Sequence, residues 1–117
     1  MIGQTRTAGQ QIQALLDHYI ARERDGAIDN LNRAVREALN AIEADPQAGR
    51  PYPASYRALA QRGFSWVKVG RYWFAYTTRK GYPVVTNVFY EAANIPGRIA
   101  GEDEEVPVIR VLVHKSH

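Results

Sequence analysis

Apolar residues recur at helical spacing through the first half of the 117-residue chain. A first stripe, at positions i, i+3, i+4, i+7 and i+8, consists of Ile12, Leu15, Leu16, Tyr19 and Ile20. A second stripe consists of Ile28, Leu31, Val35, Ala38, Leu39 and Ile42. One apolar stripe on an otherwise polar segment is typical of an amphipathic helix. Because the link between the stripes is short, the pattern predicts an antiparallel helix hairpin.

The expected ends of this hairpin come from capping and helix-breaking residues. Thr7, followed three residues later by Gln10, predicts a capping box at the start of the first helix. Asp25 and Gly26 predict the turn between the helices. Pro46 cannot donate a hydrogen bond to the helical ladder, so it ends the second helix. We therefore expect the helix hairpin at residues 8–45.

The hydrophobic period changes to two after a loop rich in proline, DPQAGRPYPAS. Alternating side chains predict strands at residues 66–69, 72–77 and 83–91, with a turn at RKGY before the last of them. A further β-like run, VPVIRVLV, occupies residues 106–113.

The order of these elements predicts an α+β fold in one domain, residues 1–117. The hairpin is expected to pack on one face of a three- to four-stranded, mainly antiparallel sheet at residues 64–98. Residues 99–117 are expected to form a C-terminal extension, which is a candidate for an added edge strand.

Composition narrows the class of protein. The chain has no cysteine, which excludes disulfides, cysteine metal sites and thiol nucleophiles and suits a reducing compartment. The N-terminus lacks the apolar region of a signal peptide, and no apolar run reaches membrane-spanning length. His18, His114 and His117 do not show the spacing of metal ligands. We expect a cytoplasmic protein with neither a metal nor a cofactor.

Positive charge is concentrated in the middle of the chain. Residues 49–101 carry eight basic side chains against one acid, Glu91, whereas the flanking segments are each net negative. Such a basic segment attracts nucleic acids or acidic protein surfaces. Lys68 alternates with Val67 and Val69, so it is expected to point away from the face that the valines share. The outer face of the sheet is therefore predicted to be a surface that meets another molecule.

A basic and aromatic set supplies the candidate site. The residues expected to bind a partner or target are Arg57, Lys68, Arg71, Tyr72, Arg79, Lys80 and Arg98. The set could bind phosphates, with arginines on the oxygens and tyrosines stacked on bases. It could also cleave RNA, with the catalytic candidates Arg71, Arg79, Tyr90 and Glu91. A third interpretation makes the tyrosines core-edge aromatics and pairs Glu91 with a neighbouring arginine.

Several motifs, in this order, resemble the RelE/ParE superfamily of bacterial toxins. Two alanine-rich helical stripes are followed by DPQAGRP, YRAL, FAYTTR and VVTNVFYEAANIPGRI. The resemblance covers roughly residues 8–98. The chain departs from the family where a histidine often ends the last strand, because Tyr90 stands there. It departs again where the family has Arg-Asp, because Ala93 and Asn94 stand there.

The ParE branch is the more similar, since it places two full-length helices before the sheet. The resemblance implies a toxin of a type II toxin–antitoxin module, of the plasmid-stabilisation kind, that inhibits DNA gyrase and is neutralised by a cognate antitoxin. It also implies a homodimer or a toxin–antitoxin hetero-oligomer. The alternative is a RelE-like endoribonuclease that cleaves mRNA on the ribosome. A second alternative is a non-toxic family member that only binds a protein.

Overall fold

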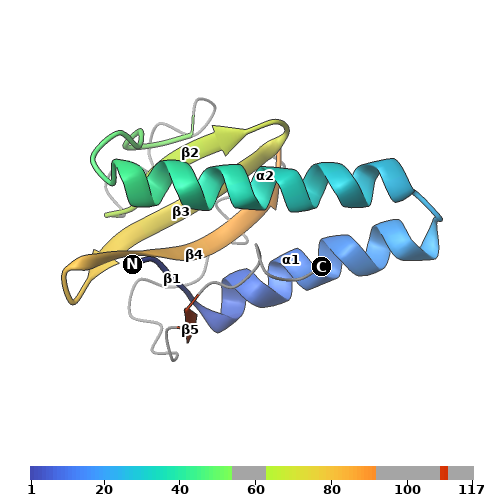
Figure 1. The fold of residues 1–117 in the computed structure, drawn as a ribbon, viewed down its shortest axis with the longest axis horizontal. Coiled ribbons are helices and arrows are strands. Elements are labelled where there is room, and N and C mark those ends of the chain that lie inside the picture. Colours follow the sequence, from blue (N-terminus) through green and yellow to red (C-terminus); the bar gives the residue numbers. More distant parts are fainter. Residues whose placement is uncertain (54–62, 92–108, 111–117) are drawn as a thin grey trace.

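Two antiparallel helices lie on one face of a five-stranded sheet (Figure 1). The computed structural model describes residues 1–53, 63–91 and 109–110. The helices are α1 (Arg6–Ala21) and α2 (Asp25–Ala44). The strands are β1 (Gly3–Gln4), β2 (Ser65–Val69), β3 (Tyr72–Arg79), β4 (Tyr82–Tyr90) and β5 (Ile109–Arg110). The predicted α+β fold, with a helix hairpin packed on a sheet, is confirmed.

The sheet has one strand more than the three to four predicted. Its strand order is β2-β3-β4-β1-β5, and β1 lies between β4 and β5. The β1–β4 pairing is parallel, whereas β2–β3, β3–β4 and β1–β5 are antiparallel. The strand β1 was missed because it contains only Gly3 and Gln4, which show no hydrophobic alternation. The edge strand β5 lies within the β-like run at residues 106–113.

The N-cap of helix α1 lies two residues before the predicted one. Its N-cap is Thr5, whose side-chain oxygen accepts a hydrogen bond from the Ala8 backbone N–H at 3.2 Å. Thr7 lies inside the helix, so the prediction of Thr7 and Gln10 as a capping box is wrong. The reason is the preceding strand, because the Thr5 backbone N–H continues the pairing by donating to the Val85 carbonyl at 3.0 Å. The chain is therefore still extended at Thr5 and turns into the helix directly after it.

The turn between the helices also lies earlier than predicted. Asp25 is the first residue of α2, and Gly26 lies within the helix. The chain reverses over residues 22–24, where Glu23 adopts a positive φ of 53°. A negative side chain in the first helical turn interacts favourably with the helix dipole, which explains why Asp25 starts the helix instead of forming the turn.

A β-bulge in β4 holds α1 against the sheet. The register shifts so that Ala75 faces Asn87 while Tyr76 faces Val85, which leaves Thr86 as the extra residue. The Thr5 hydroxyl donates to the Thr86 carbonyl at 3.1 Å. Further along, the Val88 N–H donates to Gln11 Oε1 at 2.8 Å. Both bonds pair a backbone group of β4 with a side chain of α1 or of its N-cap residue. They thereby fix where α1 crosses the sheet.

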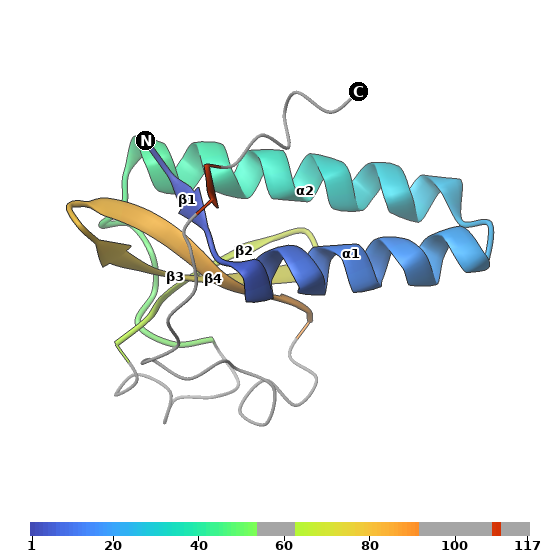
Figure 2. The ribbon, with the colours of Figure 1, turned by 90° about the horizontal axis from the view of Figure 1, so that it is seen from below.

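The main core lies between the hairpin and the sheet (Figure 2). The predicted α2 stripe faces it, with Ile28 half-buried and the other five residues buried. The α1 stripe is confirmed except at its end, because Ile20 is 57% exposed. The hairpin extends beyond the ends of β2 and β3 at its turn (Figure 1), so the last turn of α1 has no strand beneath it.

The opposite face of the sheet carries a second core, which corrects the prediction of an open recognition surface. Buried aromatic and apolar residues cluster there, namely Phe64, Trp66, Trp73, Ala75 and Phe89. The rings of Trp66 and Phe89 stack at a centroid distance of 6.3 Å. Lys68 is exposed, and its Nζ lies 5.7 Å from the centre of the Trp73 ring. Both faces of the sheet are thus apolar, in agreement with the unbroken run of aromatic and apolar residues at the start of β3.

Candidate functional site

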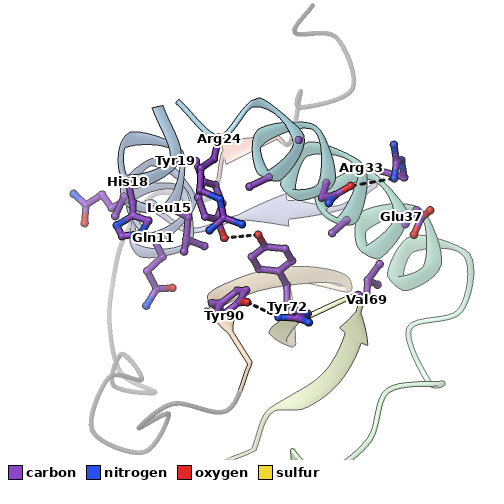
Figure 3. A pocket seen from close by; sticks show the side chains of 18 of the residues that line it. Gln11, Leu15, His18, Tyr19, Arg24, Arg33, Glu37, Val69, Tyr72 and Tyr90 are labelled. Carbon is purple, nitrogen blue, oxygen red and sulfur yellow. Dashed lines mark hydrogen bonds between the residues drawn. The ribbon is translucent and has the colours of Figure 1, made fainter. Parts of the chain in front are cut away.

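A groove with a volume of about 1250 Å³ lies between the hairpin and one end of the sheet (Figure 3). Residues of both helices line one side of it. The turn between β2 and β3 and the end of β4 line the other side. The groove follows from the overhang of the hairpin, because the helices continue where the strands end.

Two tyrosines connect the walls of this groove. Tyr72 points from β3 to Tyr19 of α1, and the two phenolic oxygens lie 2.7 Å apart (Figure 3). Burial raises the pKa of the Tyr72 phenol above its ordinary range, and the hydrogen bond with Tyr19 raises it further. The Tyr72 ring also meets Tyr90 edge-on, with centroids 5.5 Å apart. Tyr72 is therefore a neutral phenol that holds the two layers together at the groove.

Arg71 forms the sheet-side rim. Its Nη1 donates to the Tyr90 hydroxyl oxygen at 3.0 Å, and its Nε lies 3.8 Å from Glu91 Oε1. The Glu91 backbone N–H donates to the Arg71 carbonyl, so the end of β4 stays beside the turn. The bond to Tyr90 is the main cause that raises the pKa of Arg71. Arg71 is thus a cation held at the rim, and Glu91 pairs with it as the third interpretation expected.

Sequence reasoning missed the helix side of this site. The Arg24 guanidinium lies 5.7 Å from the centre of the Tyr19 ring, within range of a cation–π interaction. The ring of His18 meets Tyr19 edge-on at 5.7 Å, and its Nδ1 lies 3.1 Å from Arg22 Nη1. His18 lies on the polar side of the first helical stripe, and Arg22 and Arg24 lie in the turn between the helices. The pattern carries no signal for which polar positions face a groove, since this depends on how far the hairpin overhangs the sheet.

The structure divides the predicted basic set. Arg71, Tyr72, Tyr90 and Glu91 lie together, but Arg79 and Lys80 lie at the opposite end of β3. Seven residue steps of about 3.3 Å separate Tyr72 from Arg79, or about 23 Å.

Lys68 lies apart from both ends, on the face of the second core. Arg57 and Arg98 lie outside the described residues. The described members of the basic set therefore do not form one site, and a single phosphate could not contact both Arg71 and Arg79.

The groove is chemically suited to binding. A general acid or base works best with a pKa near the operating pH. The pKa values of Tyr72 and Arg71 are both raised further above neutrality, so both groups keep their protons at pH 7. Within the described part of the chain, no three His, Cys, Asp or Glu side chains lie close enough to hold a metal ion.

The sequence matches no model of a known protein family and no curated protein. Among the described residues, no helix is both long enough and apolar enough to cross a bilayer.

Proposed function

We propose that this chain is a ParE-like toxin of a bacterial type II toxin–antitoxin module, which inhibits DNA gyrase by binding it. A cognate antitoxin would neutralise the toxin in a hetero-oligomer in the cytoplasm. The observation that carries the proposal is the groove between the sheet and a hairpin of two full-length helices, of 16 and 20 residues. This arrangement agrees with the ParE-like order of the sequence motifs.

Binding is favoured over catalysis by the charge states in the groove. Tyr72 is a neutral phenol and Arg71 a cation with raised pKa, and neither exchanges a proton readily near pH 7. Both can hold an acidic or aromatic surface of a partner through hydrogen bonds and ring contacts. The proposal places the partner contact on the groove and not on Arg79 and Lys80, which lie at the other end of β3.

A plasmid supercoiling assay with purified gyrase tests this function. We expect the antitoxin-free protein to stop supercoiling or to trap cleaved plasmid. A variant with Arg24→Gln and Arg71→Gln should need at least about tenfold more protein for the same inhibition, since charged contacts at an interface centre are costly to remove. The matched control replaces Arg79 and Lys80 by glutamine at the far turn and should inhibit like the wild type. Unimpeded supercoiling by the folded wild-type protein would reject the proposal.

The second candidate function is RelE-like cleavage of mRNA on the ribosome. It is favoured by one observation, the 3.0 Å bond between Arg71 Nη1 and the Tyr90 oxygen, which places a cation beside a phenol. In such an enzyme Arg71 would stabilise charge on the phosphate, and Tyr90 or Glu91 would move the proton. Arg79 lies too far away to share that phosphate.

Cleavage of mRNA by programmed ribosomes tests this candidate. Tyr90→Phe should lower the rate by about tenfold or more if the phenol transfers a proton. An unchanged rate in Tyr90→Phe would contradict that role. If neither gyrase inhibition nor cleavage is found, and expression causes no growth arrest, the non-toxic protein-binding alternative remains.

A further inference from the structure

Hydrogen-bond donors dominate the rim of the groove. A guanidinium has five N–H donors. Arg71 directs one Nη1 donor to Tyr90 at 3.0 Å and its Nε lies 3.8 Å from Glu91 Oε1, so the two donors of Nη2 lie outside both described contacts. Tyr90 accepts that bond through its oxygen, so its own O–H remains a donor for a further acceptor. Arg24 and Arg33 line the same groove, against the single lining carboxylate of Glu37 among the described residues. This arrangement favours an anionic ligand.

Aromatic rings lie beside these donors. Tyr19, Tyr72 and Tyr90 all line the groove, but Tyr19 and Tyr72 are buried, whereas Tyr90 is only half-buried. The edge-on contact of Tyr72 with Tyr90 holds the Tyr90 ring at an angle of 67° to the Tyr72 ring. Stacking on aromatic side chains is a general way to hold a nucleobase and does not require a particular base. A ligand with an anionic end and a flat aromatic end would therefore use both features at once.

The charge distribution favours a compact ligand over a long strand. A bound nucleic-acid strand needs a groove in which cations follow its backbone. Here Arg79 and Lys80 lie about 23 Å from Tyr72 along β3, and Lys68 lies on the other face of the sheet. The described cations near the tyrosines are gathered in one groove. A volume of about 1250 Å³ exceeds that of most small-molecule pockets and accommodates a mononucleotide.

We propose that this groove binds a nucleoside 5′-monophosphate, with the phosphate at Arg71 and the Tyr90 hydroxyl and the base against the half-buried Tyr90 ring. This ligand goes beyond the proposed function, which concerns protein partners only. Binding is measured on the isolated protein, so its failure is independent of the gyrase assay.

The first experiment is a titration of the ¹⁵N-labelled protein with AMP, followed by amide chemical shifts at constant ionic strength. We expect the shifts to concentrate at the groove, around Tyr19, Arg71 and Tyr72. Adenosine lacks the phosphate and ribose 5-phosphate lacks the base, so each should bind at least about tenfold more weakly than AMP. Inorganic phosphate should also bind at least about tenfold more weakly. Affinity for AMP equal to that for inorganic phosphate, or shifts spread over all basic residues, would overturn the proposal.

Substitutions then test the assigned contacts. Arg71→Gln should weaken AMP binding by about tenfold or more, because a charged hydrogen-bond donor to the phosphate is lost. Tyr90→Phe keeps the ring and removes the hydroxyl, so it should weaken AMP by severalfold while leaving adenosine binding unchanged. Arg79→Gln is the matched control at the far turn and should bind AMP like the wild type. Equal effects of Arg71→Gln and Arg79→Gln would refute the site.

A short single-stranded RNA serves as a comparison ligand. Affinity close to that for AMP supports a site for one nucleotide. Affinity more than about tenfold tighter would indicate contacts with several nucleotides, which contradicts a compact site and favours the nuclease candidate.

Discussion

The two ends of strand β3 look alike in sequence and differ in structure. At one end, Gly70 and Arg71 form the turn to β2, and at the other end Lys80 and Gly81 form the turn to β4. The first turn lies beside the overhanging hairpin and lines the groove. There the guanidinium of Arg71 is held by Tyr90 and Glu91. At the far turn Lys80 is exposed and has a positive φ of 53°.

This comparison of the two turns shows that a basic side chain joins a site only where another element of the fold packs over the end of its strand. A charge count along residues 49–101 treats both turns as one basic segment. Two antiparallel strands place consecutive turns at opposite ends of the sheet, so residues at these turns are separated by the strand length. At the groove end, Tyr19 of α1 contacts Tyr72 of β3 through their hydroxyl groups, so a helix packs over this end of the strand.

The largest expected effect comes from removing the tyrosine that closes the groove end. Tyr72 is 5% exposed and contacts both Tyr19 and Tyr90. Tyr72→Ala should lower the free energy of unfolding by about 3–4 kcal/mol, as expected for a large aromatic lost from a core. Tyr82→Ala removes a half-buried ring beside the far turn and should cost about 1 kcal/mol. Urea denaturation measures both, and equal losses would mean that the two ends are packed alike.

Much of the fold could be predicted because buried residues recur along the chain with the period of the helix or strand that contains them. The α2 stripe from Leu31 to Ile42 was predicted from spacing alone, and those residues are buried. The strand β5 falls within the run at residues 106–113 that was predicted to be β-like. The strand β1 was missed, because it has only two residues and is stabilised by pairing with distant segments. Local pattern carries no information on such pairing. The N-cap of α1 could not be predicted for the same reason. Thr7 matches the local capping motif, but the cap is Thr5, because the strand pairing continues up to that residue.

The site was predicted in part. Arg71, Tyr72 and Tyr90 were in the candidate set because they are basic or aromatic residues of the positively charged middle segment. Tyr19 was assigned to a core stripe, and the structure gives it both roles, since it is buried and bonded to Tyr72. Arg24 could not be predicted, because its contact with the groove depends on the hairpin overhang.

A smaller effect is expected in the pH dependence of stability. The pKa of Tyr72 is raised first by burial and then by the bond to Tyr19. Above pH 10, the ordinary value for tyrosine, the unfolded chain loses this proton before the folded chain does. The folded state then binds more protons, so the free energy of unfolding falls as pH rises, whereas below pH 10 the contribution is fully present. Tyr72→Phe should make this fall shallower.

Denaturation at pH values on both sides of pH 10 measures the slope, and Tyr76→Phe is the comparison at mid-strand. Burial also raises the pKa of Tyr76, but its hydrogen bonds oppose the shift. Its substitution should therefore change the slope less than Tyr72→Phe does. Identical slopes for the wild type and Tyr72→Phe would contradict the assignment of this pH dependence to Tyr72.

The smallest expected effect is at the far turn itself. Lys80 and Gly81 both have positive φ, of 53° and 86°, as in a type I′ turn, which favours Asn-Gly. Lys80→Asn should therefore raise the free energy of unfolding by about 0.5 kcal/mol, because asparagine adopts this conformation more readily than lysine. Arg71→Asn at the groove turn should not stabilise, since Arg71 has no positive φ and its bond to Tyr90 would be lost. Thermal unfolding of the two variants would show opposite shifts, and a stabilising Arg71→Asn would show that Arg71 contributes to the turn alone.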